Sequence, residues 1–191
     1  MRLLTYGFGP YRQFKDNVTG KILSRLPRRN GLKKVVFPVR FNKSQFINAL
    51  ETCEPDIVLG LGQCSSGRRL RIESRARNRR RNHAGEKLRP IVRGGPQELK
   101  TDLKLDLGRG GRPSKDAGDY VCNYSMYVML DFIRRRGLEV RFGFIHIPHS
   151  YDPETAARSL LRVLDKFRGD ESRVSRLQRL PSKPVKARPS L

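Results

Sequence analysis

The stretch DIVLGLG, residues 56–62, is a short continuous apolar run that ends in glycines. Such a run is typical of a strand that is buried on both faces of a parallel sheet. The segments before it alternate between strand and helix patterns. RLLTYGF (2–8) and KKVVFPVRF (33–41) predict strands, the second at an edge or bulge because of Pro38. NVTGKILSRL (17–26) and NKSQFINALETC (42–53) predict helices, the latter capped by Asn42 or Ser44.

The alternation continues after the basic stretch GRRLRIESRARNRRRN (67–82) and a Gly/Pro-marked region to Pro113, where we expect loops with short strands. DAGDYVCNYSMYVMLDFIRRRG (116–137) predicts the strongest helix, with acidic residues at its front, arginines at its back and a stop at Gly137. LEVRFGFIHIP (138–148) predicts a strand, and DPETAARSLLRVLDKF (152–167) a helix with Asp152 as N-cap and Pro153 at its first position.

This order of elements predicts the α/β class: a three-layer α/β/α sandwich around a mostly parallel, mixed sheet. We expect residues 1–168 to form a single domain. Residues 169–191 are rich in Ser, Pro, Lys and Arg, and we expect them to form a basic, disordered tail.

The charge is extreme, with 41 Lys and Arg against 18 Asp and Glu, a net charge of +23. Such a field attracts polyanions, and much of it lies in the run Arg68–Arg81 and in the tail. Solvated faces are the simpler interpretation, because aromatic residues that would stack on bases do not interleave with either cluster. A nucleic-acid- or polyanion-binding protein is the alternative function.

The three cysteines, Cys53, Cys64 and Cys122, form no CxxC pair, which argues against a disulfide framework and a structural zinc site. The N-terminal apolar stretch is too short for a signal peptide, and no segment approaches the length of a membrane span. We therefore expect a reduced, cytoplasmic protein without a membrane partner.

The segment GDYVCNYSMY (118–127) places Cys122 in the first turns of a helix, where the helix dipole favours a thiolate and lowers the pKa of the thiol. His146 ends the apolar strand FGFIHIP, and Glu73 follows the glycine-bearing strand end. Active sites of open α/β sheets form at such strand ends and helix starts. A thiol, an imidazole and a carboxylate together supply a nucleophile, its base and the group that orients the base.

Each of these residues also has a simpler structural interpretation. Cysteine on the apolar face of a helix is most often a core residue, and Glu73 among arginines is most simply a salt-bridge partner. Cys64 is a rival nucleophile, and His149 and His83 are rival bases. Spacing alone leaves these choices open.

Four motifs in the same order resemble the pyroglutamyl peptidase I family, the C15 cysteine peptidases. They are TYGFGPYRQFKDN (5–17), PDIVLGLGQCSSGR (55–68) with IESRARN (72–78), DAGDYVCNYSMY (116–127) and GFIHIP (143–148). The resemblance covers about residues 1–167, and the cysteine and histidine motifs are its most specific parts.

The resemblance implies that Cys122 is the nucleophile, His146 the general base and then acid, and Glu73 the residue that orients the imidazole. It implies a substrate pocket that includes Tyr11, Phe14 and Asn17. The substrate would be a peptide with a blocked N-terminus, from which a pyroglutamyl residue is removed through a thioester. The resemblance requires no metal or organic cofactor, and it allows a homo-oligomer.

The sequence departs from the family pattern at Arg12 and Gln13, where the family usually has two glycines, so the pocket is expected to differ in size or preference. An amidase for another capped or cyclic amide is therefore a third hypothesis. The segment after Asn78 also departs, so the family's active-site arginine is not mapped, although Arg79, Arg80 and Arg81 are available.

Overall fold

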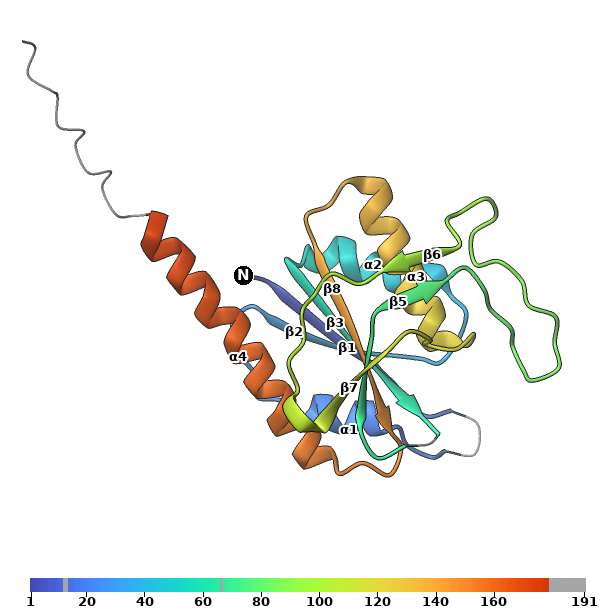
Figure 1. Ribbon diagram of the computed structural model, residues 1–191, viewed down its shortest axis with the longest axis horizontal. Helices are drawn as coiled ribbons and strands as arrows, with labels where there is room; N and C mark the ends of the chain where they lie inside the picture. The colour runs from blue at the N-terminus through green and yellow to red at the C-terminus, as the bar shows by residue number, and fades with distance from the viewer. Residues whose placement is uncertain (12–13, 66, 179–191) are drawn as a thin grey trace, which may run out of the picture.

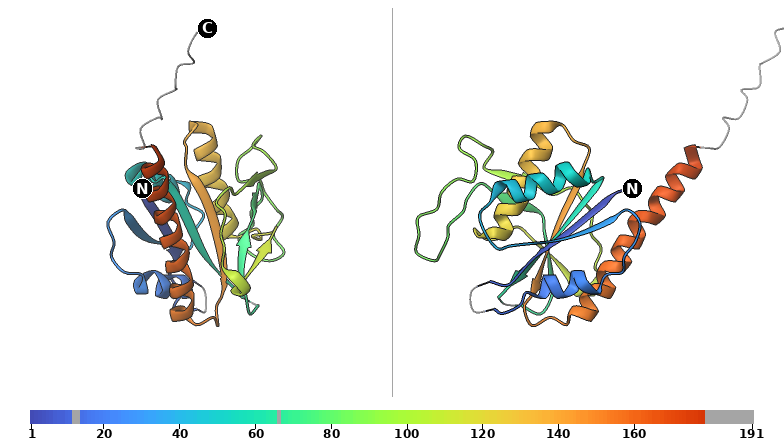
Figure 2. Two further views of the ribbon diagram at one scale, coloured as in Figure 1. Left: turned by 60° about the vertical axis from the view of Figure 1, so that its left-hand side comes forward. Right: turned by 180° about the vertical axis from the view of Figure 1, so that it is seen from behind.

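The computed structural model describes residues 1–11, 14–65 and 67–178, and it has helices on both faces of a central sheet (Figure 1 and Figure 2). The six strands of this sheet lie in the order β2-β1-β3-β8-β4-β7. They are β1 (Leu3–Phe8), β2 (Leu32–Phe37), β3 (Ile57–Cys64), β4 (Leu70–Glu73), β7 (Gly111–Ser114) and β8 (Arg141–Pro148). A separate antiparallel pair joins β5 (Arg75–Arg77) to β6 (Glu98–Lys100).

The central sheet is mixed but mostly parallel, as the sequence predicted. Strands β2, β1, β3 and β8 pair in parallel, and β4 pairs with β7 in parallel. The exception is the antiparallel pairing of β4 with β8, which places Arg71 opposite His146 and Glu73 opposite Phe144. Strand β2 lies at the edge and ends at Phe37, immediately before Pro38, which cannot donate to a ladder.

The helices form the two outer layers. Helices α2 (Lys43–Cys53) and α3 (Val121–Arg136) pack on one face, and α1 (Val18–Arg25) and α4 (Pro153–Gln178) on the other. Asn17 and Asn42 cap α1 and α2 by accepting hydrogen bonds from the backbone two residues later. The short 3₁₀ turn η1 (Gly108–Gly110) leads into β7.

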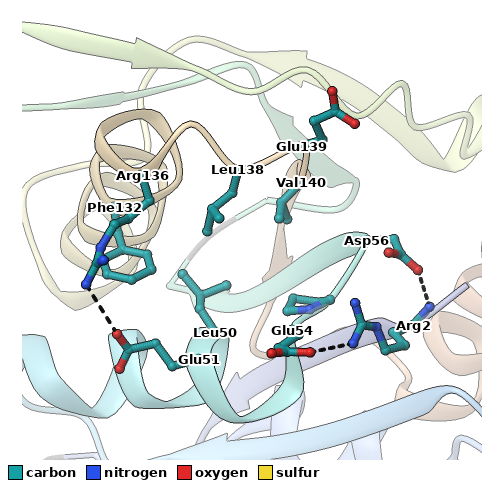
Figure 3. Close-up of a pocket in the computed structure, with 11 residues that line it drawn as sticks. Arg2, Leu50, Glu51, Glu54, Asp56, Phe132, Arg136, Leu138, Glu139 and Val140 are labelled. Carbon is teal, nitrogen blue, oxygen red and sulfur yellow. Dashed lines mark hydrogen bonds and ion pairs between the residues drawn. The ribbon is translucent and has the colours of Figure 1, made fainter.

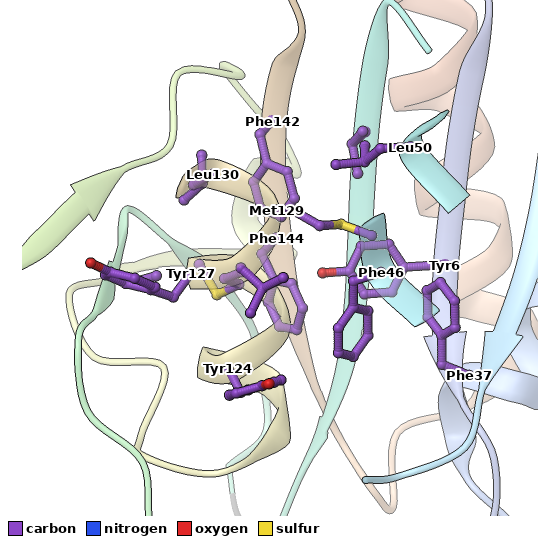
Figure 4. Packing of buried hydrophobic residues seen from close by; sticks show 14 of the residues in the cluster. Tyr6, Phe37, Phe46, Leu50, Tyr124, Tyr127, Met129, Leu130, Phe142 and Phe144 are labelled. Carbon is purple, nitrogen blue, oxygen red and sulfur yellow. The ribbon is translucent and has the colours of Figure 1, made fainter. Parts of the chain in front are cut away.

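The face covered by α2 and α3 has an aromatic core. Tyr6 and Phe144 come from the sheet and Phe46 from α2, and Figure 4 shows them packed together beside α3. The Tyr6 hydroxyl shares a 3.0 Å hydrogen bond with Ser125 Oγ, which donates to the carbonyl of Cys122 at 2.8 Å. The core therefore ties β1 to the first turns of α3.

Three element boundaries differ from the sequence-based expectation. Helix α3 begins at Val121, so the acidic residues Asp116 and Asp119 precede the helix, and β8 begins at Arg141. Helix α4 continues through Gly169 to Gln178, so it extends into the segment 169–191 for which a disordered tail is expected. A single glycine costs a helix only about 1 kcal/mol, which is too little to end it.

The rest of the expected tail, residues 179–191, lies outside the described residues. Within the described ranges, no helix combines the length and the apolar character that crossing a membrane requires.

Candidate active site

Cys122 lies at the second position of α3, beside the carboxyl ends of β3 and β8. The N-cap residue is Tyr120, which does not give the side-chain cap that asparagines give to α1 and α2. The backbone N–H groups of Val121, Cys122 and Asn123 have no partner within the helix. These N–H groups are suited to stabilising a negative charge that develops beside the sulfur.

Gly62 on β3 allows the sulfur and the imidazole to come together. A Cβ atom added at Gly62 would lie 2.7 Å from Cys122 Sγ and 2.9 Å from His146 Cδ2. The sulfur and the ring are thus separated by no more than the sum of these two distances. Gly62 is also the parallel partner of His146, so a side chain at this position would stand between the two groups.

His146 and Glu73 form a buried pair. Nδ1 of His146 lies 2.8 Å from Glu73 Oε1, and the exposed fractions of the two residues are 3% and 0%. Because the carboxylate accepts from Nδ1–H, the free ring nitrogen is Nε2, which is bonded to the Cδ2 atom near the sulfur. Glu73 therefore reaches the imidazole from the end of β4.

The expectation that the position at the helix start leaves Cys122 with a lowered pKa was wrong. Burial raises the pKa of the Cys122 thiol to about 12, and the neighbouring Cys64 and Glu73 act in the same direction. The charge of Arg71 and the backbone N–H of Cys122 oppose the rise without cancelling it. The thiol is therefore protonated at neutral pH and needs a base at the moment of attack.

A pocket of about 190 Å³ opens beside Cys122. Tyr11, Phe14 and Asn17, the predicted substrate-binding residues, all line it, together with Tyr120, whose ring lies 5.1 Å from that of Tyr11. The other lining residues are Phe8, Val39, Gln63, Cys64, Ser65, Val121 and Cys122. None of these described lining residues is charged. Arg12 and Gln13, expected to alter this pocket, lie outside the described residues.

Two amide side chains in the pocket have their oxygens occupied. Asn17 Oδ1 accepts from the backbone N–H and the hydroxyl of Thr19, and Gln63 Oε1 accepts from the backbone N–H of Val18 at 2.9 Å. The groups that remain are NH₂ donors. The pocket thus combines aromatic rings with hydrogen-bond donors.

The rival residues are arranged differently. Cys64 lines the same pocket, but it lies at the end of β3 and not at a helix start. The ring of His149 packs 5.7 Å from that of Phe14, and its backbone N–H donates to the carbonyl of Cys64. The side chain of His83 is 70% exposed and lies 4.0 Å from Glu86. Only His146 is both buried and hydrogen-bonded to a carboxylate within the described residues.

Sequence reasoning missed three residues that build the site: Gly62, Asn123 and Arg71. Asn123, next to Cys122, accepts from the backbone N–H of Arg77 and donates to the carbonyls of Arg77 and Arg79. It thereby fixes the start of α3 to the chain just after Glu73. The glycine pair in GLG was visible as a signal of close approach, whereas Arg71 was hidden among other arginines.

The arginine run does not form one open cationic surface, because several of its members are paired. Arg80 lies over the ring of Phe41, with its Cζ 5.2 Å from the ring centroid. The ion pairs are Arg75 with Glu98, Arg77 and Arg79 with Asp116, and Arg81 with Asp119. This pairing reduces the field available to a polyanion.

A larger cavity, of about 610 Å³, lies at the amino ends of the strands, opposite Cys122. Figure 3 shows apolar residues such as Leu50 and Leu138 among ion pairs that join Arg2 to Glu54 and Arg136 to Glu51. Its described lining contains neither cysteine nor histidine, so size alone does not identify the reactive site.

Comparisons with known proteins agree with this geometry. A profile of the family described as "Pyroglutamyl peptidase" matches residues 100–160, which contain Cys122 and His146. The chain is 33% identical to the pyrrolidone-carboxylate peptidase of Pyrococcus furiosus, over 87% of this chain and 86% of that protein. It is 30% identical to that of Halalkalibacterium halodurans, over 83% and 89%.

The fold is similar to that of solved structures. The structure of a mutant pyrrolidone carboxyl peptidase from Pyrococcus furiosus matches with a TM-score of 0.77 and 26% identity, covering 86% of this chain and 97% of that chain. This match confirms the predicted α/β architecture.

Proposed function

The chain belongs to the pyroglutamyl peptidase family of cysteine peptidases, and we propose that it hydrolyses the bond that follows an N-terminal pyroglutamyl residue of a peptide. The observation that carries this proposal is the uncharged, aromatic pocket beside Cys122. Its volume of about 190 Å³ and its uncharged lining suit a small neutral ring.

Because none of the described lining residues is charged, the pocket favours an uncharged N-terminal group of the substrate over a charged one. A free N-terminus brings an ammonium group, and an open glutamate brings a carboxylate. Either group would lose its hydration in this pocket without a counter-ion there, which is costly. A pyrrolidone ring carries no charge, and its flat faces suit the rings of Tyr11, Phe14 and Tyr120.

The lactam also needs hydrogen bonds. Its carbonyl is an acceptor, and Asn17 and Gln63 keep only NH₂ donors after their oxygens are used by the backbone and Thr19. The lactam carbonyl is therefore a group whose hydrogen bonds these two amides can satisfy.

The catalytic steps follow from the positions of Cys122, His146 and Glu73. As Sγ attacks the carbonyl carbon of the pyroglutamyl residue, Nε2 of His146 takes the thiol proton, and Glu73 holds Nδ1–H. Proton transfer accompanies attack because the thiol is protonated beforehand. N–H groups of the first turn of α3 stabilise the oxyanion of the tetrahedral intermediate.

Collapse of the intermediate breaks the C–N bond, and the imidazolium gives its proton to the leaving amine. The product is a thioester on Cys122. Water then attacks the thioester while His146 takes a proton from it, and the thiolate leaves and regains that proton. Free pyroglutamate is released, and every group returns to its starting state.

The test compares two substrates on three proteins. Pyroglutamyl-aminomethylcoumarin and prolyl-aminomethylcoumarin differ in that the first has a neutral lactam and the second a cationic amine in a ring of the same size. We expect a preference of at least about 100-fold for the lactam, because the site has donors for its carbonyl and no counter-ion for the amine. Cys122→Ala should abolish turnover, whereas the matched variant Cys64→Ser should keep it.

Preference for the prolyl substrate would contradict the proposed specificity. Turnover that survives Cys122→Ala, or that is lost in a folded Cys64→Ser variant, would transfer the nucleophile role from Cys122 to Cys64.

A further inference from the structure

Arg71 lies on the same face of the sheet as the buried His146–Glu73 pair. It precedes Glu73 by two residues in β4, so both side chains point to the same side of the strand. In the antiparallel pairing of β4 with β8, Arg71 is the direct partner of His146. Side chains in such opposed positions are immediate neighbours.

The guanidinium of Arg71 contacts the oxygen that binds the imidazole. Nε of Arg71 lies 3.6 Å from Glu73 Oε1, the atom that lies 2.8 Å from Nδ1 of His146. Oε1 is thus placed between a permanent positive charge and the ring. Nothing in the sequence of this basic stretch distinguished Arg71 from arginines that face solvent.

Burial makes this contact important. Glu73 is fully buried, and its Oε2 has no hydrogen-bond partner among the described residues. The side chain of Arg71 is only 26% exposed, and its Nε is buried and lacks a hydrogen bond within the same residues. A buried carboxylate requires a counter-charge, and Arg71 is the permanent cation in ion-pair contact with it.

We propose that Arg71 is a positioning residue: its guanidinium supplies the counter-charge of Glu73 and fixes the carboxylate, so that Glu73 holds the His146 ring with Nε2 available to Cys122. This inference rests on the proposed function. Arg71 touches neither the substrate nor the sulfur in this role, and it acts through Glu73.

A positive charge at this position also affects the two proton-transfer partners. It disfavours the imidazolium that forms when the thiol is deprotonated, and it lowers the pKa of Cys122 against the larger effect of burial. The charged and titratable groups that the described contacts place beside the ring are Glu73 and Arg71 on β4 and Cys122 on α3. Arg112 on β7 pairs with Arg71 one strand farther away, and Cys64 on β3 and Tyr6 on β1 interact with Cys122.

The test uses Arg71→Gln, which removes the charge, Arg71→Lys, which keeps it, and Arg112→Gln as the matched control. Arg112 is exposed and pairs with Arg71 across β4 and β7, so its loss removes an equal charge one strand farther from Glu73. The measurements are kcat and KM for pyroglutamyl-aminomethylcoumarin between pH 5 and 9.5, together with the melting temperature.

We expect Arg71→Gln to lower kcat roughly tenfold with little change in KM, since the ring is less well oriented. The acid limb of kcat/KM should move to higher pH by about half a unit, because loss of the cation stabilises the imidazolium. Arg71→Lys should restore most of both properties, and Arg112→Gln should resemble the wild type. A lower kcat with an unshifted pH profile, or a profile shifted equally by Arg112→Gln, would overturn the proposal.

A second measurement separates this inference from the proposed function. The ring signals of His146 are followed by NMR as a function of pH in the wild type and in Arg71→Gln, with His146→Gln used for assignment. An inactive wild type would refute the proposed function, yet a titration of His146 moved to higher pH in Arg71→Gln would still support the role of Arg71. An unchanged titration would overturn that role whatever the activity.

Discussion

Substituting Gly62 by alanine should damage catalysis more than folding. The added Cβ would lie 2.7 Å from Cys122 Sγ, 2.7 Å from Phe144 Cζ and 2.9 Å from His146 Cδ2. Non-bonded heavy atoms normally lie about 3.5–4.0 Å apart, so at least one of these side chains must move by roughly 1 Å. Phe144 is fully buried and His146 is held by Glu73, so the sulfur has to move, and it moves away from the ring.

The size of the effect follows from that displacement. Misplacing reacting groups by about 1 Å costs on the order of 100-fold in rate, equal to about 2.7 kcal/mol of transition-state stabilisation. Overpacking of a core costs about 1–3 kcal/mol of stability. We therefore expect Gly62→Ala to fold with a lower melting temperature and to show a kcat/KM reduced about 100-fold on pyroglutamyl-aminomethylcoumarin.

Gly60→Ala is the matched control. Its Cβ would lie 2.5 Å from Phe144 Cδ2 and 2.6 Å from Cζ and the hydroxyl oxygen of Tyr6, so the crowding is similar and on the same face of β3. Neither the sulfur nor the imidazole is among the three atoms nearest to this Cβ. We expect a similar loss of stability and a much smaller loss of activity. A folded Gly62→Ala protein with more than half of the wild-type kcat/KM, or equal losses in both variants, would refute this reasoning.

Three further outcomes follow from the site. Glu73→Gln should lower kcat at least about 100-fold in a folded protein, measured by turnover, because an amide no longer fixes the His146 tautomer; near-normal turnover would contradict this. Asn123→Ala should cost about 3 kcal/mol in urea unfolding, because its hydrogen bonds to the chain after β4 are lost; an unchanged midpoint would show that they contribute little. Burial raises the pKa of Cys122 and of Tyr6, so the unfolded chain loses these protons first and stability falls as the pH rises above about 9. By pH 10.5 the fall should be about 2 kcal/mol larger in the wild type than in Cys122→Ala, and equal declines would contradict the raised pKa.

Much of the fold was predictable because local patterns and packing agree. Apolar runs such as residues 56–62 became buried strands, and Asn17 and Asn42 cap helices as short polar side chains do. Strand β4 is different, because LRIE alternates apolar and charged residues over only four positions, and its place in the sheet is set by its neighbours β7 and β8. Its antiparallel direction, which brings Glu73 to His146, is a property of the sheet and not of the segment.

The reactivity of the site was less predictable than its location. The helix start identified Cys122, but the pKa of its thiol depends on how deeply the sulfur is buried, which sequence does not show. The contact between Arg71 and Glu73 was hidden for a related reason. A charged side chain in a basic run looks solvated until the register of two distant strands is known.

The protonated state of Cys122 has a practical consequence for covalent inhibitors. Generic electrophiles such as iodoacetamide react with thiolates, so they should label this sulfur slowly at neutral pH. An effective inhibitor would carry a small uncharged ring that first occupies the pocket beside Tyr11 and Phe14 and brings its reactive carbon to the sulfur. Such an inhibitor would be selective over enzymes that keep a permanent thiolate, because its ring must bind in the pocket before the bond to the sulfur forms.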